Sequence, residues 1–446
     1  MNRYIKKAFK LLILIFFLAV NIIAVTRTSP KSASILSAVT VFVCLFLTIK
    51  RKYGVTPTIC LLIYTILTQF GLVWPYVVLG NGVLSNYNIY TLRFLKSIYL
   101  PQAICIASVA IICFSIGFII ADKETKNELE EHANHILSDD GLSQTGIVVS
   151  CAIILSITLL VFIFGILRGD ISIFGSYSDY MSSELYSNSF YVYLLLFYGI
   201  GTVFLFTIND KKIRNILFII WFLIAAILFL TGNKGEVLYA AFTCYGFIAI
   251  EKKKANRKLI VLGLIMLFLI IPLITNSRPD GVVANLNNIK FSFTDAFVEM
   301  GMQIRMSVFM INDVKTGVRH LLLGKSYYNP VLMLINHFIP LFGHLEIATR
   351  DIYDIYKGYG SSQVAESYLN FGLYGVVGFF GILGFILRHF EQKIDTTFGL
   401  ALFGCVVFVF MNATRNHFYF VPVQLVIVFS LFLVLYIIPK RKHLQK

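Results

Sequence analysis

Long apolar runs separated by short polar segments occupy most of the chain, and within each run the hydrophobic residues are continuous rather than alternating. A membrane-spanning helix needs about 20 apolar residues, whereas the strands of an outer-membrane barrel alternate apolar and polar positions. The pattern therefore predicts an all-α polytopic integral membrane protein. About 12 transmembrane helices are expected, near residues 8–25, 34–49, 55–79, 101–121, 146–167, 188–208, 214–231, 236–250, 258–275, 371–388, 397–412 and 418–438.

The expected spans are distributed unevenly. About nine fall in an N-terminal membrane block, residues 1–275, and about three in a C-terminal membrane block, residues 371–446. The segment between them, residues 276–370, is predicted to be a large loop with amphipathic or re-entrant helices. Within it, residues 290–314 alternate Phe and Met with polar positions, which favours an amphipathic helix on the bilayer interface or packed on the bundle. Residues 321–343 are apolar enough to enter the membrane partly.

Composition excludes a soluble globular protein, because 58% of the residues are hydrophobic and only 14% are charged. The net charge of +15 is also unevenly placed: Lys and Arg concentrate in one set of alternate loops, such as 50–52 and 252–258, and are sparse in the other set. Short basic loops stay on the cytoplasmic side. Both termini are therefore expected to be cytoplasmic and the 276–370 loop extracytoplasmic. The positive charge then requires no nucleic-acid partner.

Cysteine and glycine positions add two structural expectations. All seven cysteines lie inside apolar runs, which indicates small buried side chains rather than a disulfide framework. Without a CxxC motif or a Cys/His cluster, neither a metal site nor a cofactor is expected. Glycine recurs at every third position from Gly372 to Gly384, and this stripe predicts close packing against a neighbouring helix.

The expected extracytoplasmic segments hold few charged residues, each isolated among aromatic residues and glycines. Such isolation favours a binding cavity over interface anchoring, because a solvated loop carries mixed charges in bulk. Structural alternatives remain open for three of them: a salt bridge to Glu236 for Lys234, helix capping for Glu366, and structural hydrogen bonding for His337. The candidates are Lys234, Arg278, Glu299, Arg305, Lys325, His337, Arg350, Glu366 and Arg415.

Five stretches carry a resemblance to a known family through their order and through the large late loop. The chain resembles the O-antigen polysaccharide polymerase (Wzy-type) family, most closely in its C-terminal half. The stretches are TGNKGE at 231–236, EMGMQIR at 299–305, LLGKSYYNPVLMLINHFIP at 322–340, SSQVAESYLNFGLYG at 361–375 and TRNHFYF at 414–420.

The resemblance implies polymerisation of oligosaccharide repeat units carried on undecaprenyl diphosphate, at the outer face of the bacterial cytoplasmic membrane. A hydroxyl of one unit attacks the anomeric carbon of the growing chain, and lipid diphosphate leaves. The transfer is expected to be inverting, metal-independent and without cofactor. The implied partners are a lipid-linked oligosaccharide donor and acceptor, membrane lipid, a chain-length regulator and a flippase.

Each candidate residue has an expected role in that chemistry. Cationic side chains would bind the diphosphate and carry the charge that develops on the leaving oxygen, and a general base would deprotonate the acceptor hydroxyl. His337 is the first choice for the base, followed by Glu299 and Glu366. The diphosphate-binding candidates are Arg278, Arg305, Arg350, Arg415, Lys234 and Lys325.

Two departures from the family limit the transfer of motifs. The family and its ligase relatives usually have Arg at the hairpin tip where this chain has Lys234, and Lys binds phosphate as a point charge rather than bidentately. Nine residues separate Arg350 from Gly360, whereas some polymerases have an Arg-x10-Gly pattern. That pattern is therefore not carried over to this chain.

Two other functions fit parts of the same pattern. An O-antigen ligase-type transferase would use similar chemistry but attach the finished glycan to another acceptor. A lipid-linked oligosaccharide flippase or other transporter would need charged groups along a pathway through the spans. The expected spans are nearly free of charged residues, which favours the polymerase over a transporter.

Overall fold

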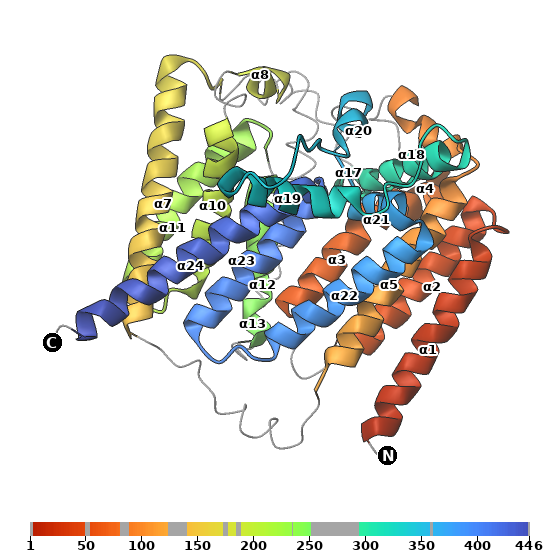
Figure 1. Cartoon of the computed structure of the whole chain (residues 1–446), viewed down its shortest axis with the longest axis horizontal. Helices are drawn as coiled ribbons and strands as arrows, with labels where there is room; N and C mark the ends of the chain where they lie inside the picture. The colour runs from red at the N-terminus through yellow and green to blue at the C-terminus, as the bar shows by residue number, and fades with distance from the viewer. Residues whose placement is uncertain are drawn as a thin grey trace. The chain divides into compact units, whose positions relative to one another are not determined.

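The fold is described from a computed structural model (Figure 1), which covers residues 3–49, 54–80, 89–123, 141–172, 177–183, 189–233, 235–250, 294–356 and 360–444. Every regular element in these ranges is a helix. Eight of the described helices are long and apolar enough to cross a membrane, and one bent pair would make a ninth. The all-α polytopic class is thereby confirmed.

Three of the expected spans differ from these long helices. Residues 235–250 and α23 (Thr397–Ala413) are apolar helical segments too short to meet the same length test. The expected span 258–275 lies outside the described residues. The expected number of about 12 spans therefore stays a prediction.

The chain divides into two compact units, each built from segments distant in sequence. Unit 1 comprises Met1–Ala133, Phe297–Lys393 and Val409–Leu425, and unit 2 comprises Asn134–Ala296, Ile394–Phe408 and Val426–Lys446. The helices of unit 1 are α1 (Arg3–Ala24), α2 (Pro30–Thr48), α3 (Pro57–Phe70), α4 (Val73–Leu79), η2 (Ile89–Lys96), α5 (Leu100–Ala121), η4 (Gly301–Gln303), α18 (Ile304–Lys315), α19 (Lys325–Phe338), α20 (Arg350–Ile355), α21 (Gln363–Phe371), α22 (Leu373–Glu391) and η5 (Phe418–Phe420), with most of α17 (Asp295–Met300).

Unit 2 contains the helices of the central part of the chain. These are α7 (Gly141–Arg168), α8 (Tyr177–Ser182), α10 (Ser189–Thr207), α11 (Lys211–Leu230), α12 (Gly235–Tyr245) and α13 (Phe247–Ile250), with parts of α23 and of α24 (Val421–Leu444). Helix α11 begins where the Asp210 carboxylate accepts hydrogen bonds from the N–H groups of Lys212 and Ile213, as an N-cap residue does. The Trp221 indole donates to Thr202 Oγ1 at 2.9 Å, which fixes α11 against α10.

Helix α5 is the core of unit 1. It is apolar on all sides and almost completely buried, as expected of a helix surrounded by other helices. Helix α22 packs along it (Figure 1), and a Cβ added to Gly384 would lie 2.2 Å from the carbonyl oxygen of Phe114. Gly117 of α5 meets the carbonyl of Gly381 in the same way. The close packing predicted from the glycine stripe is confirmed at these positions, although Gly378 faces open space.

The third expected span, residues 55–79, is broken into α3 and α4, which meet at an angle of 46°. At the break, a Cβ on Gly71 would lie 2.4 Å from the Phe297 carbonyl oxygen. From the other side, a Cβ on Gly301 would lie 1.9 Å from the Leu72 amide nitrogen. Two glycines therefore allow the backbones of two chain segments to touch, and the helix bends where the second segment enters.

The amphipathic helix expected over residues 290–314 is described from residue 294 and is interrupted. It forms α17, a 3₁₀ turn at η4 and then α18. The apolar face of α18 is buried in unit 1, where Met306 and Met310 pack with Ile352, Ala365 and Leu369. Helix α18 is therefore packed on other helices of unit 1, and its position relative to the bilayer stays a prediction.

Candidate functional site

A buried polar cluster forms in unit 1, where α21 meets η4, the first turn of α19 and residues 413–418. Helix α21 begins at Ser362, whose hydroxyl accepts a hydrogen bond from the Ala365 N–H and also one from the Gln69 amide at 3.1 Å. Gly360, two residues earlier, has φ of +72° and lies against the Arg415 carbonyl, where a side chain would be strained. This turn aims the polar face of α21 into the protein. We call the group around it the Glu366 cluster.

Glu366 is the titratable centre of the cluster. It is only 3% exposed, and its Oε2 accepts a hydrogen bond from the Phe418 N–H at 2.9 Å. Burial raises the pKa of this carboxyl from 4.5 to about 7, and the Ser326 hydroxyl and the Phe418 N–H oppose that rise only in part. A carboxylate with such a pKa can both take up and release a proton near neutral pH.

The first turn of α19 closes over this carboxylate. Asn370 donates to Ser326 Oγ at 2.7 Å and to the Glu366 carbonyl oxygen at 2.9 Å. The Tyr327 hydroxyl donates to Ser367 Oγ at 2.8 Å, and its ring packs edge-on against Phe418. Burial and the neighbouring Glu366 carboxylate raise the pKa of Tyr327, so its phenol stays protonated. These hydroxyl and amide groups hold α19 on α21.

Arg415 joins the cluster through an amide bridge. With the Gln303 amide oriented to suit its neighbours, its nitrogen donates to the Ser361 carbonyl at 2.6 Å and its oxygen accepts from Arg415 Nε at 3.1 Å. The Ser361 N–H donates to the Arg415 carbonyl at 2.9 Å. The Arg415 guanidinium is thus bound through Gln303 to the turn that precedes α21, and Glu366 lies on that helix, 49 positions before Arg415 in the chain.

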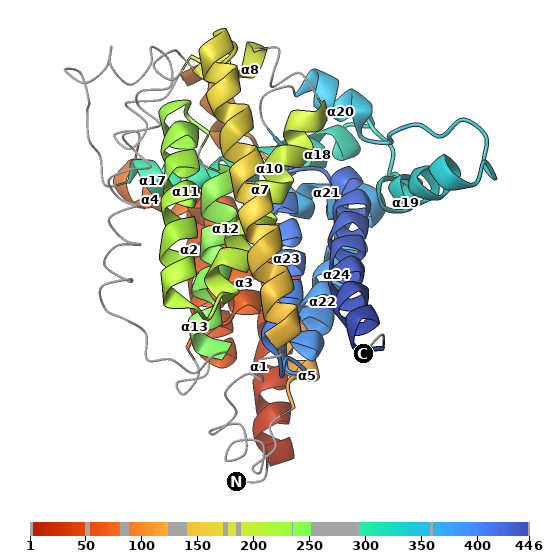
Figure 2. The same ribbon diagram turned by 90° about the vertical axis from the view of Figure 1, so that its left-hand side faces the viewer.

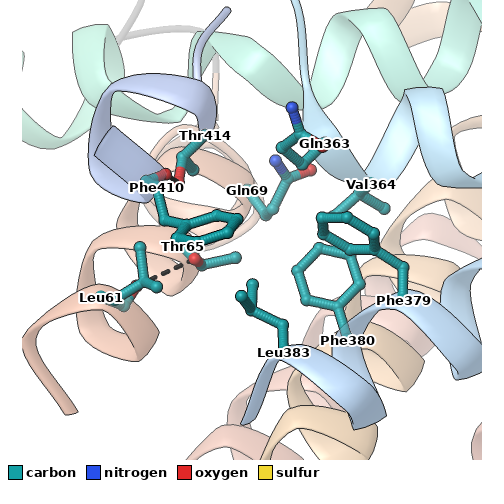
Figure 3. Close-up of a pocket in the computed structure, with 10 residues that line it drawn as sticks. All are labelled: Leu61, Thr65, Gln69, Gln363, Val364, Phe379, Phe380, Leu383, Phe410 and Thr414. Atoms are coloured by element: carbon teal, nitrogen blue, oxygen red, sulfur yellow. Dashed lines mark hydrogen bonds between the residues drawn. The ribbon is translucent and has the colours of Figure 1, made fainter. Parts of the chain in front are cut away.

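A small cavity lies below the cluster, between α3, α22 and the end of α23 (Figure 3). Gln69, Gln363, Thr65 and Thr414 supply its polar wall, and Phe379, Phe380 and Phe410 supply apolar walls. The space open to a water-sized molecule is about 10 Å³, roughly what one water needs. The buried Gln363 Oε1 has no hydrogen-bond partner among the described residues, and a water here would satisfy it. A sugar unit does not fit this cavity.

A second charged group fixes α20 outside the cluster. Arg319 Nε lies 3.1 Å from Asp313 Oδ2, and the same guanidinium is paired with Asp351. The Tyr356 hydroxyl donates to Asp313 Oδ2 at 3.0 Å, and its ring stacks on Phe309. These contacts hold the helix that begins at Arg350 against the end of α18.

The expected site residues fall into four groups. Glu366 and Arg415 belong to the cluster, and Arg305, partly buried, begins α18 two residues after Gln303. Glu299 is buried on α17, between Phe297 and Gly301, whose backbones contact the α3–α4 break. Lys325, His337 and Arg350 are exposed, and His337 lies at the far end of α19 from the cluster. Lys234 and Arg278 lie outside the described residues.

Several residues of the cluster were not expected from the sequence. Ser326, Ser362 and Asn370 lie inside stretches that carry the family resemblance. They are uncharged, and in those stretches only a charged or ionisable side chain indicates a catalytic or binding role. Gln69 lies in an apolar run, where a buried amide is itself a signal. His417 is also nearly buried, and burial lowers the pKa of its imidazole to about 4, so it is neutral at pH 7. Among the described residues, no three His, Cys, Asp or Glu side chains converge on a metal-binding group.

Comparisons with known proteins extend over almost the whole chain. The family model for O-antigen polysaccharide polymerase Wzy matches residues 8–446. The Staphylococcus aureus protein CapE is 25% identical over 400 residues, which cover 87% of this chain and 86% of that protein. No solved structure gives a significant match.

Proposed function

The chain belongs to the O-antigen polysaccharide polymerase Wzy family, and on that premise we propose that the Glu366 cluster is where it joins repeat units. The protein is a bacterial inner-membrane enzyme that polymerises lipid-linked oligosaccharide units into O antigen or capsule polysaccharide. The observation that carries the proposal is a buried carboxylate with a pKa of about 7 on α21, the helix whose preceding turn is bound to Arg415 through Gln303.

In the proposed reaction the Glu366 carboxylate accepts the proton of the acceptor hydroxyl. The hydroxyl oxygen forms a bond to the anomeric carbon of the donor chain. The bond from that carbon to the diphosphate oxygen breaks, and the lipid diphosphate leaves with the bonding electrons. Attack opposite the leaving group inverts the anomeric centre. General-base help of this kind contributes about 10²–10⁴-fold to the rate.

Cations near the cluster would stabilise the leaving diphosphate. Arg415 and Arg305 are the leading candidates. Arg415 donates a hydrogen bond to Gln303, and Arg305 follows Gln303 by two residues in the chain. Lys325 adjoins Ser326, whose hydroxyl contacts the cluster. Each charge-assisted hydrogen bond to phosphate contributes about 1.5–3 kcal/mol. Arg350, Lys234 and Arg278 stay candidates for the same role, and His337 and Glu299 stay alternative bases.

We assign the site to the extracytoplasmic face, with both termini cytoplasmic and undecaprenyl diphosphate as the lipid carrier. The asymmetric distribution of Lys and Arg supports this orientation. A reaction that needs no metal or nucleotide sugar suits that compartment. Access to Glu366 then requires the first turn of α19 to shift, because Ser326 and Tyr327 close over a carboxylate that is 3% exposed.

The purified full chain in proteoliposomes provides the test of this function. Supplied with lipid-linked repeat units alone, it should form a ladder of longer lipid-linked chains and release lipid diphosphate, with the same rate in the presence of EDTA. Transfer of a preformed chain to lipid A or protein instead would identify a ligase. Movement of the units across the bilayer without elongation would identify a flippase, and either result would contradict the polymerase.

The pH dependence of polymerisation should follow ionisation of Glu366. The base acts only when ionised, so the rate should rise through a midpoint near pH 7, the pKa of Glu366. At about pH 6 it should be about tenfold below its plateau. Stability should run the opposite way: because the folded-state pKa is raised above 4.5, this group's contribution is present below pH 4.5 and lost as pH rises through about 7. A pH-independent rate between about 5 and 8 would exclude Glu366 as the base.

A further inference from the structure

Helix α19 has three distinct faces. One face packs on α21 and η5, with Ser326 and Pro330 buried there. A second face holds the connection that follows the helix: Asn329 donates to the Glu346 carbonyl at 3.0 Å, and Asn336 Oδ1 accepts from the Phe342 N–H at 2.9 Å. At 3.6 residues per turn, these two faces leave a third side of the helix free.

That third face is an exposed apolar stripe. Its residues recur at intervals of three and four, so they line one side of the helix. Their side chains are partly open, with exposed fractions that range from 39% to 71%. The α19 stripe consists of Tyr328, Val331, Ile335 and Phe338.

The stripe lies at the level where two membrane spans begin. Helix α19 contacts η5, whose first residue starts the span Phe418–Ile437, and α21, which directly precedes the span Leu373–Glu391. Figure 2 shows α19 extending sideways from unit 1, crosswise to α22. Phe371 and Phe420, at the starts of these two spans, are each 43% exposed and continue the apolar surface beyond the helix.

We propose that the α19 stripe docks into the acyl region of the lipid leaflet, so that α19 is an interfacial membrane helix. Its position at the head of two spans favours lipid over a protein partner, because a helix lying in the interface buries its apolar face about 5–10 Å into the bilayer. The connection after the helix adds the exposed Ile339 and Leu341 to the same surface. The first turn of α19 meanwhile stays on the Glu366 cluster, so the leaflet holds the helix that covers the carboxylate.

Single-cysteine reporters in the full chain test this docking without an activity measurement. All seven native cysteines are buried, so a thiol-reactive fluorophore labels the introduced site. Val331→Cys and Phe338→Cys place the fluorophore on the stripe, and His337→Cys places it off the stripe, about 100° around the helix from Phe338. In nanodiscs of phosphatidylethanolamine and phosphatidylglycerol, quenching by acyl-brominated lipids should be at least about twofold stronger for the stripe labels. Quenching by aqueous iodide should be stronger at 337.

A second variant separates docking from folding. Ile335→Glu adds a charge to a stripe side chain that is 39% exposed, so the melting temperature in detergent should change little, but the label at 338 should become accessible to iodide. Val318→Glu, on an exposed turn before α19, should leave that label protected. Equal lipid quenching at 331, 337 and 338 would overturn the proposal. So would a stripe that is water-exposed in nanodiscs and protected only in native membranes, which would indicate a protein partner.

Discussion

Glu366→Gln is expected to give a folded protein that elongates repeat units about 10²–10⁴-fold more slowly. Glutamine has the shape of glutamate, and its carbonyl oxygen can still accept the Phe418 N–H hydrogen bond seen at Oε2. It cannot accept a proton from a hydroxyl. The loss should fall on kcat rather than on KM, because the variant removes proton transfer and leaves the cations that bind the diphosphate. The rate of chain elongation in proteoliposomes measures it, and a strain carrying only this variant should display single repeat units.

Two comparisons separate a base from a structural carboxylate. Glu346→Gln changes an exposed glutamate of the same unit and should leave elongation unchanged. The melting temperature of Glu366→Gln at alkaline pH should not fall below that of the parent protein, because ionising Glu366 in its buried site is unfavourable. Normal chains from Glu366→Gln at normal expression would refute the assignment. Loss of elongation in His337→Ala or Glu299→Gln instead would move the base to one of those residues.

The fold class could be predicted from the sequence because its signal is local. In lipid, a run of about 20 apolar residues can satisfy its backbone hydrogen bonds only as a helix. The sequence of α5 alone is therefore enough to predict that helix. The break between α3 and α4 could not be predicted in this way. It depends on the backbone of η4 touching Gly71 and Leu72 from more than 200 residues away, and hydropathy is the same on either side of it.

The candidate site was predictable only in part, for a similar reason. Glu366 and Arg415 stand out as isolated charges in polar stretches, and the structure places Glu366 on α21 and binds Arg415 to the turn before that helix. Gln303 holds Arg415 against that turn, yet a glutamine has no charge to distinguish it in a sequence. His337 is also an isolated ionisable group, although most of its neighbours are apolar. Its position at the exposed end of α19 follows from where that helix ends, which single-sequence patterns define poorly.

Arg388, the last residue of the expected span 371–388, is a buried charge in the fold. Its side chain is only 12% exposed at the end of α22. Its Nη2 lies 2.6 Å from Asp122 Oδ1, and its Nη1 lies 2.7 Å from Glu391 Oε2. The guanidinium also lies over the Phe118 ring at 4.8 Å. Glu391 in turn accepts the Thr58 N–H at the start of α3, so one cation connects α3, α5 and α22.

Arg388→Met is expected to lower the free energy of unfolding by about 3–5 kcal/mol, because it leaves two carboxylates buried at less than 10% exposure without their cation. Methionine keeps much of the side-chain length, so the loss of charge dominates over a loss of packing. Denaturant unfolding of the full chain in detergent micelles measures the difference. The effect is large because the surroundings are apolar, where an uncompensated charge has no water to stabilise it.

Lys393 is an exposed cation just after the end of α22, so Lys393→Met provides the matched control. It should change the free energy of unfolding by less than about 0.5 kcal/mol. The variant that combines Arg388→Met with Asp122→Asn and Glu391→Gln should recover most of the loss, since neutral amides remove the buried charges that methionine leaves behind. If the triple variant is as unstable as Arg388→Met alone, the guanidinium stabilises unit 1 through its packing on Phe118 rather than through its charge. Recovery would instead mean that apolar packing at glycines such as Gly117 and Gly384 holds α5 and α22 together. Arg388 would then be needed only to neutralise the buried carboxylates of Asp122 and Glu391.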